Sequence, residues 1–324
     1  MAEHTLDRSL IQHDWDNSYE PVLSIASGDV VHLDLLMAGH GQVHEHSAIE
    51  EVVWDFDTIY NLAGPIHVDG ARAGDTLEVE ILSLTPGAWG WTAVIPGLGL
   101  LPDDFPHAYL KIWDLREGTS TSLAPNVRVP FRKFLGTMGV ALDEAGSFSP
   151  FPPHKGGGNM DNRHLVEGST LWLPIWCDGA RFSCGDAHAA QGDGEVCVSA
   201  IECDTHASLR LTVHRRSLSA PSFRVPAAAQ APAVDYHGTM GIDADLMLGA
   251  QKAVRAMIAW IVDEHGLSPE NAYVLASVAG DLHIHEIVDA GVWNVGMTLP
   301  LNVFVLDTTQ TSSPDVFSSS ARIA

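Results

Sequence analysis

Acidic and imidazole side chains crowd one short segment, residues 184–195, which reads Cys-Gly-Asp-Ala-His-Ala-Ala-Gln-Gly-Asp-Gly-Glu. Asp186 and His188 are two positions apart, and residues at that spacing point to the same face of an extended strand. A carboxylate and an imidazole on one face suit zinc or a similar divalent metal, which makes bound water acidic enough to attack a carbonyl group. The segment therefore predicts a hydrolytic metal site, although the same residues would also suit a polar turn between two strands.

A second segment, residues 154–164, reads His-Lys-Gly-Gly-Gly-Asn-Met-Asp-Asn-Arg-His. Its three glycines form a flexible run in front of Asp161, Arg163 and His164, which is typical of active-site loops and also of plain surface turns. Lys155 precedes the glycines, whereas the phosphate-binding P-loop places its lysine after them. The segment is therefore a candidate for catalysis and a poor one for phosphate binding.

Other residues leave alternatives open. Three further groupings could hold a metal: His44 with His46, His283 and His285 with Asp281, and His67 with Asp69. A thiolate mechanism would use Cys184 with His188 as its base. The Gly-x-Ser-x-Gly motif of serine hydrolases and the His-Glu-x-x-His motif of zinc proteases are both absent.

Composition narrows the class of protein. The 324 residues include 41 acidic and 17 basic ones, for a net charge of −24, so the chain should repel nucleic acid. It has no apolar run long enough for a membrane helix and starts without a secretory signal, which predicts a cytoplasmic protein that does not bind membranes. Its four cysteines are never spaced Cys-x-x-Cys, which predicts reduced thiols.

The elements that must position these residues are mostly β-strands. Alternating or β-prone runs predict five of them, at residues 30–36, 76–82, 169–176, 196–202 and 207–214. Frequent Pro and Gly between residues 65 and 102 exclude long helices there. The expected fold is mainly β with an α+β portion, in sandwich or barrel-like sheets with one long helix in the C-terminal part.

The C-terminal part has a different pattern. Apolar residues at helical spacing predict a helix over 243–264 that ends before Gly266, and Ser268 followed by Pro269 predicts a second helix through Ala276. Strands are expected at 282–288 and 299–306. We thus expect a β-rich part carrying the metal site (1–216), an irregular connection (217–233), an α+β part that completes the same catalytic unit (234–306) and a disordered tail (307–324).

Several segments together resemble the acetamidase/formamidase family, in its shorter branch. They are Thr58–Ile66, Gly74–Leu77, Gly90–Thr92, Gly157–Leu165, Gly185–Val196 and Ser277–Leu282. The resemblance covers nearly the whole chain up to about Leu306. It implies a β-rich fold with an inserted α+β part, hydrolysis of a small acetamide- or formamide-like amide to carboxylate and ammonia, and a divalent metal, zinc or else calcium.

The family motifs also select residues in this sequence. They imply Asp161, Asp186, His188 and Glu195 as metal ligands, with Asp161, His188 and Glu195 in catalytic roles. Glu195 would be either the fourth ligand or the general base. Asn159, Gln191, Gly157 and Gly158 would contact the substrate, and N–H groups of the 156–158 loop would stabilise the oxyanion.

Two other functions stay open at this point. The substrate could be a γ-lactam or another cyclic amide, or the carboxylates could bind calcium structurally in a non-catalytic protein built on an amidase scaffold. A homodimer or larger homo-oligomer is expected in either case.

Overall fold

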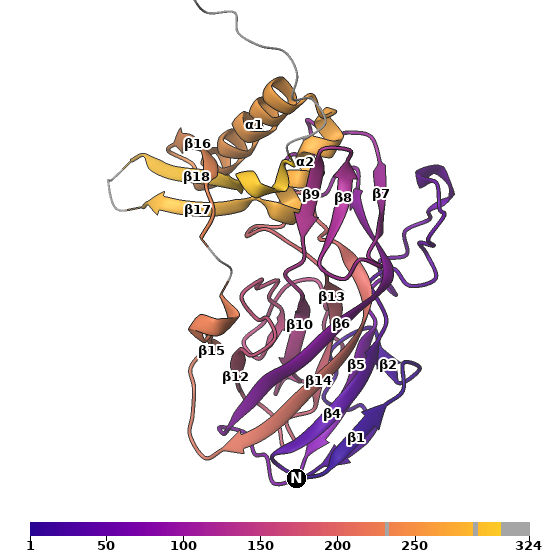
Figure 1. The fold of residues 1–324 in the computed structure, drawn as a ribbon. Coiled ribbons are helices and arrows are strands. Elements are labelled where there is room, and N and C mark those ends of the chain that lie inside the picture. Colours follow the sequence, from indigo (N-terminus) through magenta and orange to yellow (C-terminus); the bar gives the residue numbers. More distant parts are fainter. Residues whose placement is uncertain (231–232, 288–290, 306–324) are drawn as a thin grey trace, which may run out of the picture.

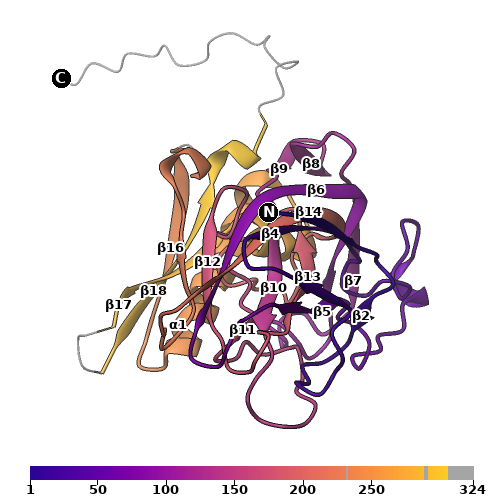
Figure 2. The same cartoon turned by 90° about the horizontal axis from the view of Figure 1, so that it is seen from below.

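A computed structural model describes residues 1–230, 233–287 and 291–305. Within these residues the fold is mainly β, as predicted, with a 13-stranded mixed sheet, a three-stranded sheet, a two-stranded sheet and two α-helices (Figure 1). The strand order of the large sheet runs from β11 to β15 with branches, so these strands do not close into a barrel. Figures 1 and 2 show the helices and the three-stranded sheet beside one end of the large sheet.

The large sheet contains β1 (Glu3–Leu6), β2 (Ile11–Gln12), β3 (Leu23–Ile25), β4 (Asp29–Leu35), β5 (Leu62–Val68), β6 (Thr76–Val94), β7 (Tyr109–Asp114), β10 (Phe134–Val140), β11 (Gly157–Asn159), β12 (Thr170–Pro174), β13 (Phe182–His188), β14 (Glu202–His214) and β15 (Ser222–Arg224). The two-stranded sheet pairs β8 (Ser120–Ala124) with β9 (Val127–Pro130), and the three-stranded one has the order β16 (Tyr236–Asp243), β18 (Trp293–Pro300), β17 (Asp281–Glu286). Short 3-10 turns lie at Ile49–Glu51, Ala227–Ala229 and Leu301–Val303.

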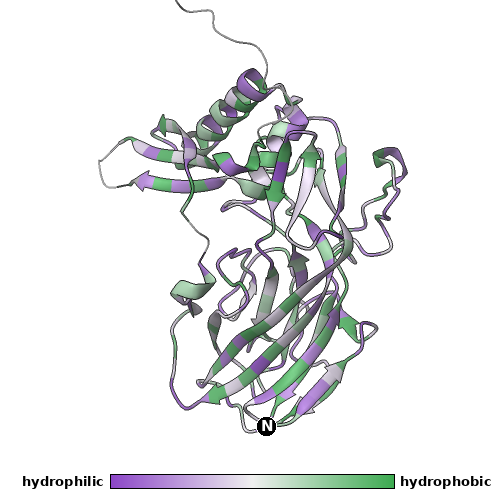
Figure 3. Ribbon diagram, in the orientation of Figure 1, coloured by the Kyte–Doolittle hydropathy of each residue, from purple (hydrophilic) through white to green (hydrophobic). Residues whose placement is uncertain are grey.

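The longest strands, β6 and β14, pair antiparallel along most of their length. Leu77, Val79 and Ile81 of β6 are buried while the glutamates between them face solvent, which is the two-residue period of a sheet with one wet face. Figure 3 shows this banding along β4, β6 and β14. Burial of the apolar set against the neighbouring strands fixes the register that the site depends on.

Local signals place the helices. α1 (Leu246–His265) begins after Asp245, whose carboxylate accepts hydrogen bonds from the N–H groups of Met247 and Leu248, and ends at Gly266 with φ 66°. α2 (Pro269–Ala279) begins after Ser268, whose hydroxyl accepts from the N–H of Asn271. Both helices, the end at Gly266 and the cap at Ser268 are confirmed, whereas α1 begins three residues after its predicted start and α2 runs three residues beyond its predicted end.

Two of the predicted strands were assigned to the wrong residues. Residues 196–201 form a loop and only Glu202 begins β14, because Val198 has φ 81° and Ser199 bonds to the backbone of Ala93 instead of to a strand neighbour. The strand expected at 299–306 lies earlier, as β18, and is followed by a 3-10 turn. The segment expected to be an irregular connection contains β15 and one 3-10 turn in its described residues, and the expected disordered tail lies outside them.

Candidate metal centre and its cavity

The site forms where the pairing of β10 with β13 is interrupted. The register runs from Leu135 opposite Ala187 to Thr137 opposite Gly185, so Gly136 and Asp186 between them are not a ladder pair. The Gly136 carbonyl instead accepts hydrogen bonds from the N–H groups of Met160 (3.1 Å) and Asp161 (3.2 Å). The interruption thus draws the 160–161 loop onto the sheet and places the Asp161 carboxylate beside that of Asp186.

His188 lies at the centre of a cluster of carboxylates. Its Nε2 atom is 3.4 Å from Asp186 Oδ1 and 3.0 Å from Glu202 Oε2, and its Nδ1 atom is 4.0 Å from Asp161 Oδ1. Donor atoms of Asp161, Asp186 and His188 all lie within 4.8 Å of one another, and so do those of His188, Glu195 and Glu202. The two groups share His188 and therefore form one site.

Several donor atoms of this site are buried without a hydrogen-bond partner among the described residues. They are Asp161 Oδ1, both ring nitrogens of His188 and Glu202 Oε2. The Nε2 atom of His188 is near two carboxylates, but neither contact has hydrogen-bond geometry. Buried polar atoms are rarely left unpaired, because each costs about 1–3 kcal/mol. A divalent cation bound to these atoms would satisfy them together, so the donor set fits a metal.

Gly136 forms the floor of this cluster. A Cβ atom at position 136 would lie 2.6 Å from both Asp161 Oδ1 and Asp186 Oδ2 and 2.8 Å from His188 Cε1. These distances are shorter than van der Waals contact, so any side chain would push the donor atoms apart. The residue opposite Asp186 must therefore be glycine for the carboxylates to converge.

Three of the acidic residues have left-handed backbone conformations. The φ angles are 45° at Asp161, 54° at Asp186 and 41° at Glu195. Non-glycine residues adopt this region seldom and at a cost of about 1–3 kcal/mol, and such strained positions concentrate at functional sites. The Asp186 angle also changes the reason for the predicted Asp–His geometry: the two side chains meet at a strand interruption and not on one face of a regular strand.

Burial and mutual repulsion set the charges of the site. Burial, followed by repulsion from Asp186, raises the pKa of Asp161 to about 7. Burial and then the Asp161 charge raise the pKa of Glu195 well above its ordinary value. Burial alone would lower the pKa of His188, but the carboxylates of Glu202 and Asp186 raise it well above its usual range. A bound cation would offset this excess of negative charge.

Several hydrogen bonds hold the residues of this cluster in place. Gln191 Nε2 donates to the backbone carbonyl of Asp161 (2.9 Å), and the Ala200 N–H donates to Glu202 Oε1 (2.9 Å). Asn159 Oδ1 accepts from the Thr137 hydroxyl (2.8 Å). Asn159 Nδ2 donates to the Tyr60 hydroxyl oxygen (3.0 Å) and to the Phe151 carbonyl (2.9 Å).

A cavity of about 270 Å³ opens onto the cluster. Its polar lining consists of four carboxylates together with Tyr60, Asn159 and Ser199, and its remaining lining is apolar. The lining residues are Ala38, Phe56, Ile59, Tyr60, Trp91, Ile95, Leu98, Phe151, Asn159, Asp161, Asp186, Glu195, Val198, Ser199 and Glu202. The four carboxylates that meet around His188 thus lie at the wall of this cavity.

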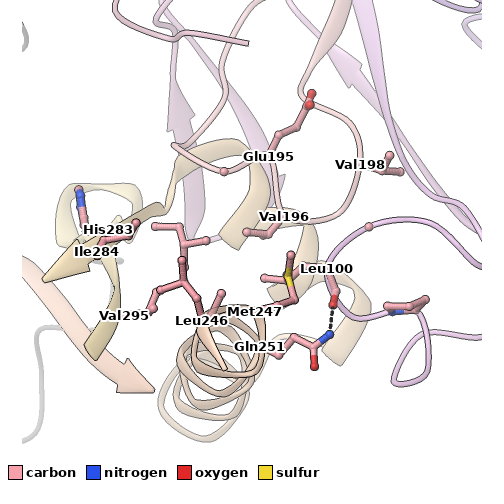
Figure 4. Close-up of a pocket in the computed structure, with 15 residues that line it drawn as sticks. Leu100, Glu195, Val196, Val198, Leu246, Met247, Gln251, His283, Ile284 and Val295 are labelled. Atoms are coloured by element: carbon pink, nitrogen blue, oxygen red, sulfur yellow. Dashed lines mark hydrogen bonds between the residues drawn. The ribbon is translucent and has the colours of Figure 1, made fainter. Parts of the chain in front are cut away.

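A larger cavity of about 970 Å³ lies on the other side of the 194–198 loop, lined by apolar residues of α1, β17 and β18. Glu195 borders both cavities, but in Figure 4 its side chain points away from Leu246 and Met247 on the α1 side. The larger cavity therefore lacks the converging donor atoms that chemistry requires.

The C-terminal part anchors the loop that carries Glu195. Gly192 N–H donates to the Ser277 carbonyl (2.7 Å), and the Asp281 carboxylate accepts from the Asp193 N–H (3.0 Å) and pairs with Arg163. A Cβ atom at Gly192 would overlap the Gly280 carbonyl oxygen at 1.6 Å. The α+β part thus contacts the Glu195 loop directly.

The predicted site residues fall into two groups. Asn159, Asp161, Asp186 and Glu195 line the small cavity, and His188 lies behind them. Gln191, Gly157 and Gly158 do not line it: Gln191 supports Asp161, and the two glycines pair with β10 in the strand that ends at Asn159.

The oxyanion role expected of the 156–158 loop has no support in its hydrogen bonds. The Gly156 N–H donates to His154 Nδ1 (3.0 Å), and the Gly157 N–H donates to the His154 carbonyl (2.9 Å). These two groups are committed within the loop and are not available to a substrate.

The alternative sites do not assemble. His44 and His46 are exposed, the rings of His283 and His285 stack 6.2 Å apart, and His67 lies 3.6 Å from Asp69 at the surface. None of the three joins a metal-binding cluster among the described residues. Cys184 is fully buried, and burial raises its pKa to about 12, which disfavours a thiolate nucleophile.

Sequence reasoning missed Glu202, Tyr60 and Gly136. Glu202 follows an apolar run and looks like the polar end of a strand, yet it is 3% exposed and opposite His188. A carboxylate between Ile201 and Cys203 was the available signal, since acidic residues are seldom buried unless paired. Nothing in the local sequence singles out Gly136, because its role depends on the partner strand.

Within the described part of the chain, no helix has the length and apolar character needed to cross a membrane.

Comparison with known proteins gives a consistent result. The model of the acetamidase/formamidase family matches residues 3–145 and 145–306. A formamidase from Methylophilus methylotrophus is 24% identical, over 92% of this chain and 90% of its own length. Among solved structures, a gamma lactamase from Delftia acidovorans (TM-score 0.86, 22% identity, 93% of each chain) shares the fold. An acetamidase from Bacillus halodurans (TM-score 0.66, 28% identity) covers 92% of this chain and 97% of its own.

Proposed function

Because the chain belongs to the acetamidase/formamidase family of amide hydrolases, we propose that it cleaves an amide to a carboxylate and ammonia at a divalent-metal site held by Asp161, Asp186 and His188. The observation that carries this proposal is the convergence of buried, unpartnered donor atoms beside a cavity.

Zinc is the metal that we propose. An imidazole at the centre of the donor set favours zinc over calcium, whose ligands are oxygen atoms. When bound, zinc would lower the pKa of a water molecule and polarise the amide carbonyl. Glu202 has one oxygen fixed by the Ala200 N–H and the other free toward His188, so we assign it as the fourth ligand or as the group that orients His188.

Glu195 is the proposed proton carrier. It lines the cavity, and its side chain makes no hydrogen bond within the described residues, so it is free to reach a substrate. Its raised pKa makes Glu195 a stronger base than an ordinary carboxylate, which suits a group that accepts a proton from water and later gives it back. As the water oxygen bonds to the carbonyl carbon, Glu195 accepts the water proton; as the carbon–nitrogen bond breaks, it gives that proton to the departing nitrogen.

Tyr60 is the proposed donor to the carbonyl oxygen. Burial and the nearby Asp186 raise its pKa well above the ordinary value, so its hydroxyl keeps its proton. The hydroxyl oxygen accepts from Asn159, which orients the group and leaves the O–H free to donate to a substrate oxygen in the cavity. We place this role on Tyr60 because the N–H groups of Gly156 and Gly157 already donate to His154.

The test measures ammonia release alongside metal content. Chelation should abolish activity toward a panel of open-chain and cyclic amides, and zinc should restore it. Asp186→Asn and His188→Gln should lose bound metal and activity together. The control is His206→Gln on β14, because that side chain is 70% exposed and does not line the small cavity. Turnover by protein shown to be metal-free would refute the proposal.

The same measurements separate a structural calcium site from a catalytic zinc site. Calcium without zinc in the purified protein, with full activity after Glu195→Gln, would favour the structural alternative. The expected homo-oligomer and cytoplasmic location stay predictions, and analytical ultracentrifugation would test the first.

A further inference from the structure

The cavity is large for the substrates after which the family is named. It measures about 270 Å³, close to the lower end of pockets that hold drug-sized ligands, which begin at about 300 Å³. A water molecule takes up about 30 Å³ of liquid, and formamide or acetamide is only a few times larger. Such an amide, held at the carboxylates, would leave much of the cavity wall without a contact.

That remaining wall is aromatic and aliphatic. The rings of Tyr60 and Phe151 meet edge to face with centroids 5.0 Å apart, and Phe56 lies 5.9 Å from Phe151. Trp91 packs at 5.3 Å against Trp54 and is buried, so its position is fixed before any ligand arrives. Aromatic side chains in these arrangements form a preorganised surface for a flat apolar group.

Part of this wall is exposed to solvent. Phe56 is 40%, Phe151 37% and Leu98 36% exposed, although each could be covered by a ligand in the cavity. Removing apolar surface from water is favourable in proportion to its area, so an apolar ligand that covers these side chains would bind better than a small polar one.

Most of the neutral polar groups of the cavity already make hydrogen bonds within the protein. Asn159 uses its amide oxygen and both N–H groups within the protein, and the Ser199 hydroxyl bonds to the backbone of Ala93. The four carboxylates of the wall would repel a negatively charged substituent. The wall thus offers little to a polar or anionic acyl group.

We infer that the cavity selects uncharged amides with a bulky apolar acyl group, with an aryl group preferred, over formamide and acetamide. The inference rests on the proposed amide hydrolysis and names its substrate class. The carboxamide would lie at the carboxylate end, and the acyl substituent would contact Phe56, Phe151 and Leu98.

The first experiment compares kcat/KM of the zinc-loaded protein for acetamide, propionamide, butyramide and phenylacetamide. The carbon next to the carbonyl is saturated in all four, which keeps their intrinsic reactivity similar. Burial of each added methylene should raise kcat/KM roughly fourfold, and phenylacetamide should exceed acetamide by about 100-fold or more. Equal values, or a preference for acetamide, would overturn the inference and leave amide hydrolysis standing.

A variant in the wall tests whether the preference comes from the named residues. Phe56→Ala should reduce the ratio of kcat/KM for phenylacetamide over acetamide by about tenfold. Val53→Ala is the matched control, because Val53 is on the same loop, is 80% exposed and does not line the cavity. An unchanged ratio in Phe56→Ala would contradict the assignment of this wall.

A binding measurement separates this inference from the proposed function. In metal-free protein, calorimetric titration should show at least about 50-fold tighter binding of phenylacetamide than of acetamide. If no amide is hydrolysed after zinc is loaded, the proposed function fails, and the titration still decides the preference of the cavity. Equal affinities would reject the inference whatever the activity.

Discussion

His188 is a fully buried imidazole whose Nε2 atom lies close to the carboxylates of Asp186 and Glu202 and whose Nδ1 atom is 4.0 Å from that of Asp161. Without a metal this arrangement is unfavourable, because the buried carboxylates around His188 carry more negative charge than bound protons can neutralise. It becomes favourable when a divalent cation replaces those protons. The buried donor atoms that lack hydrogen-bond partners therefore favour a bound metal. This observation does not depend on the family likeness.

The two glutamates at this site should respond differently to loss of charge. Glu195→Gln should keep bound zinc and lose at least about 100-fold in kcat, because the proton carrier is gone. Glu202→Gln should lower zinc affinity about 10- to 100-fold, because the side chain contacts His188 and is fixed by the Ala200 N–H. Zinc titration and steady-state kinetics check both. Loss of zinc in Glu195→Gln with retention in Glu202→Gln would reverse the two assignments.

Site residues could be predicted from the sequence only where the signal lies within one short segment. The Asp186–His188 spacing and the glycine-rich run before Asp161 were visible in the sequence, and the structure brings these side chains together. Glu202 and Gly136 could not be found in the same way, since their places depend on which strands pair. Gln191 was expected to contact substrate, whereas it holds the Asp161 backbone.

At the scale of elements, the site depends on the point at which β10 and β13 stop pairing. The interruption at Gly136 and Asp186 frees a carbonyl that captures the 160–161 loop. The end of α1 and the start of α2 were predictable because Gly266 and Ser268 act within their own turns. The 196–201 segment was predicted wrongly as a strand because its β-prone composition is overridden by contacts with Ala93 and Ser277, which are distant in sequence.

The packing of α1 on the three-stranded sheet gives a prediction at this scale. A Cβ atom at Gly241 of β16 would lie 2.0 Å from the Gly249 carbonyl oxygen of α1, so Gly241→Ala should lower the free energy of unfolding by about 2 kcal/mol or more. Gly238 on the same strand has no atom closer than 3.8 Å to its Cβ position, and Gly238→Ala should be tolerated. Urea unfolding of both variants checks this, and equal losses would show that the close approach is not important.

At the scale of the whole molecule, the α+β part contacts the Glu195 loop through Ser277, Gly280 and Asp281. The expectation of one catalytic unit with an internal boundary at 217–233 stays a prediction. The mainly β class and the long C-terminal helix were predictable from periodicity. The branched 13-stranded sheet was not, because pairings such as β4 with β14 join segments over 160 residues apart.

Metal binding should also change the pH dependence of global stability. The folded-state pKa of Asp161 is raised from 3.8 to about 7, so metal-free folded protein binds more protons than unfolded protein in that range. The contribution of Asp161 to the free energy of unfolding is therefore fully present below pH 3.8 and is lost as the pH rises through about 7. Relative to Asp161→Asn, the Tm of the metal-free protein should therefore fall between pH 5 and pH 8, and zinc should reverse the fall. Parallel curves for the two proteins would contradict the shift.

We propose above all that Asp161, Asp186 and His188 bind a divalent metal. A crystal structure with anomalous diffraction recorded on both sides of the zinc absorption edge tests it most directly. One anomalous peak is expected at the zinc edge, about 2.0–2.2 Å from an oxygen of each aspartate and from a nitrogen of His188, at a position open to the small cavity. Fully active protein with no anomalous peak among these three side chains would contradict it.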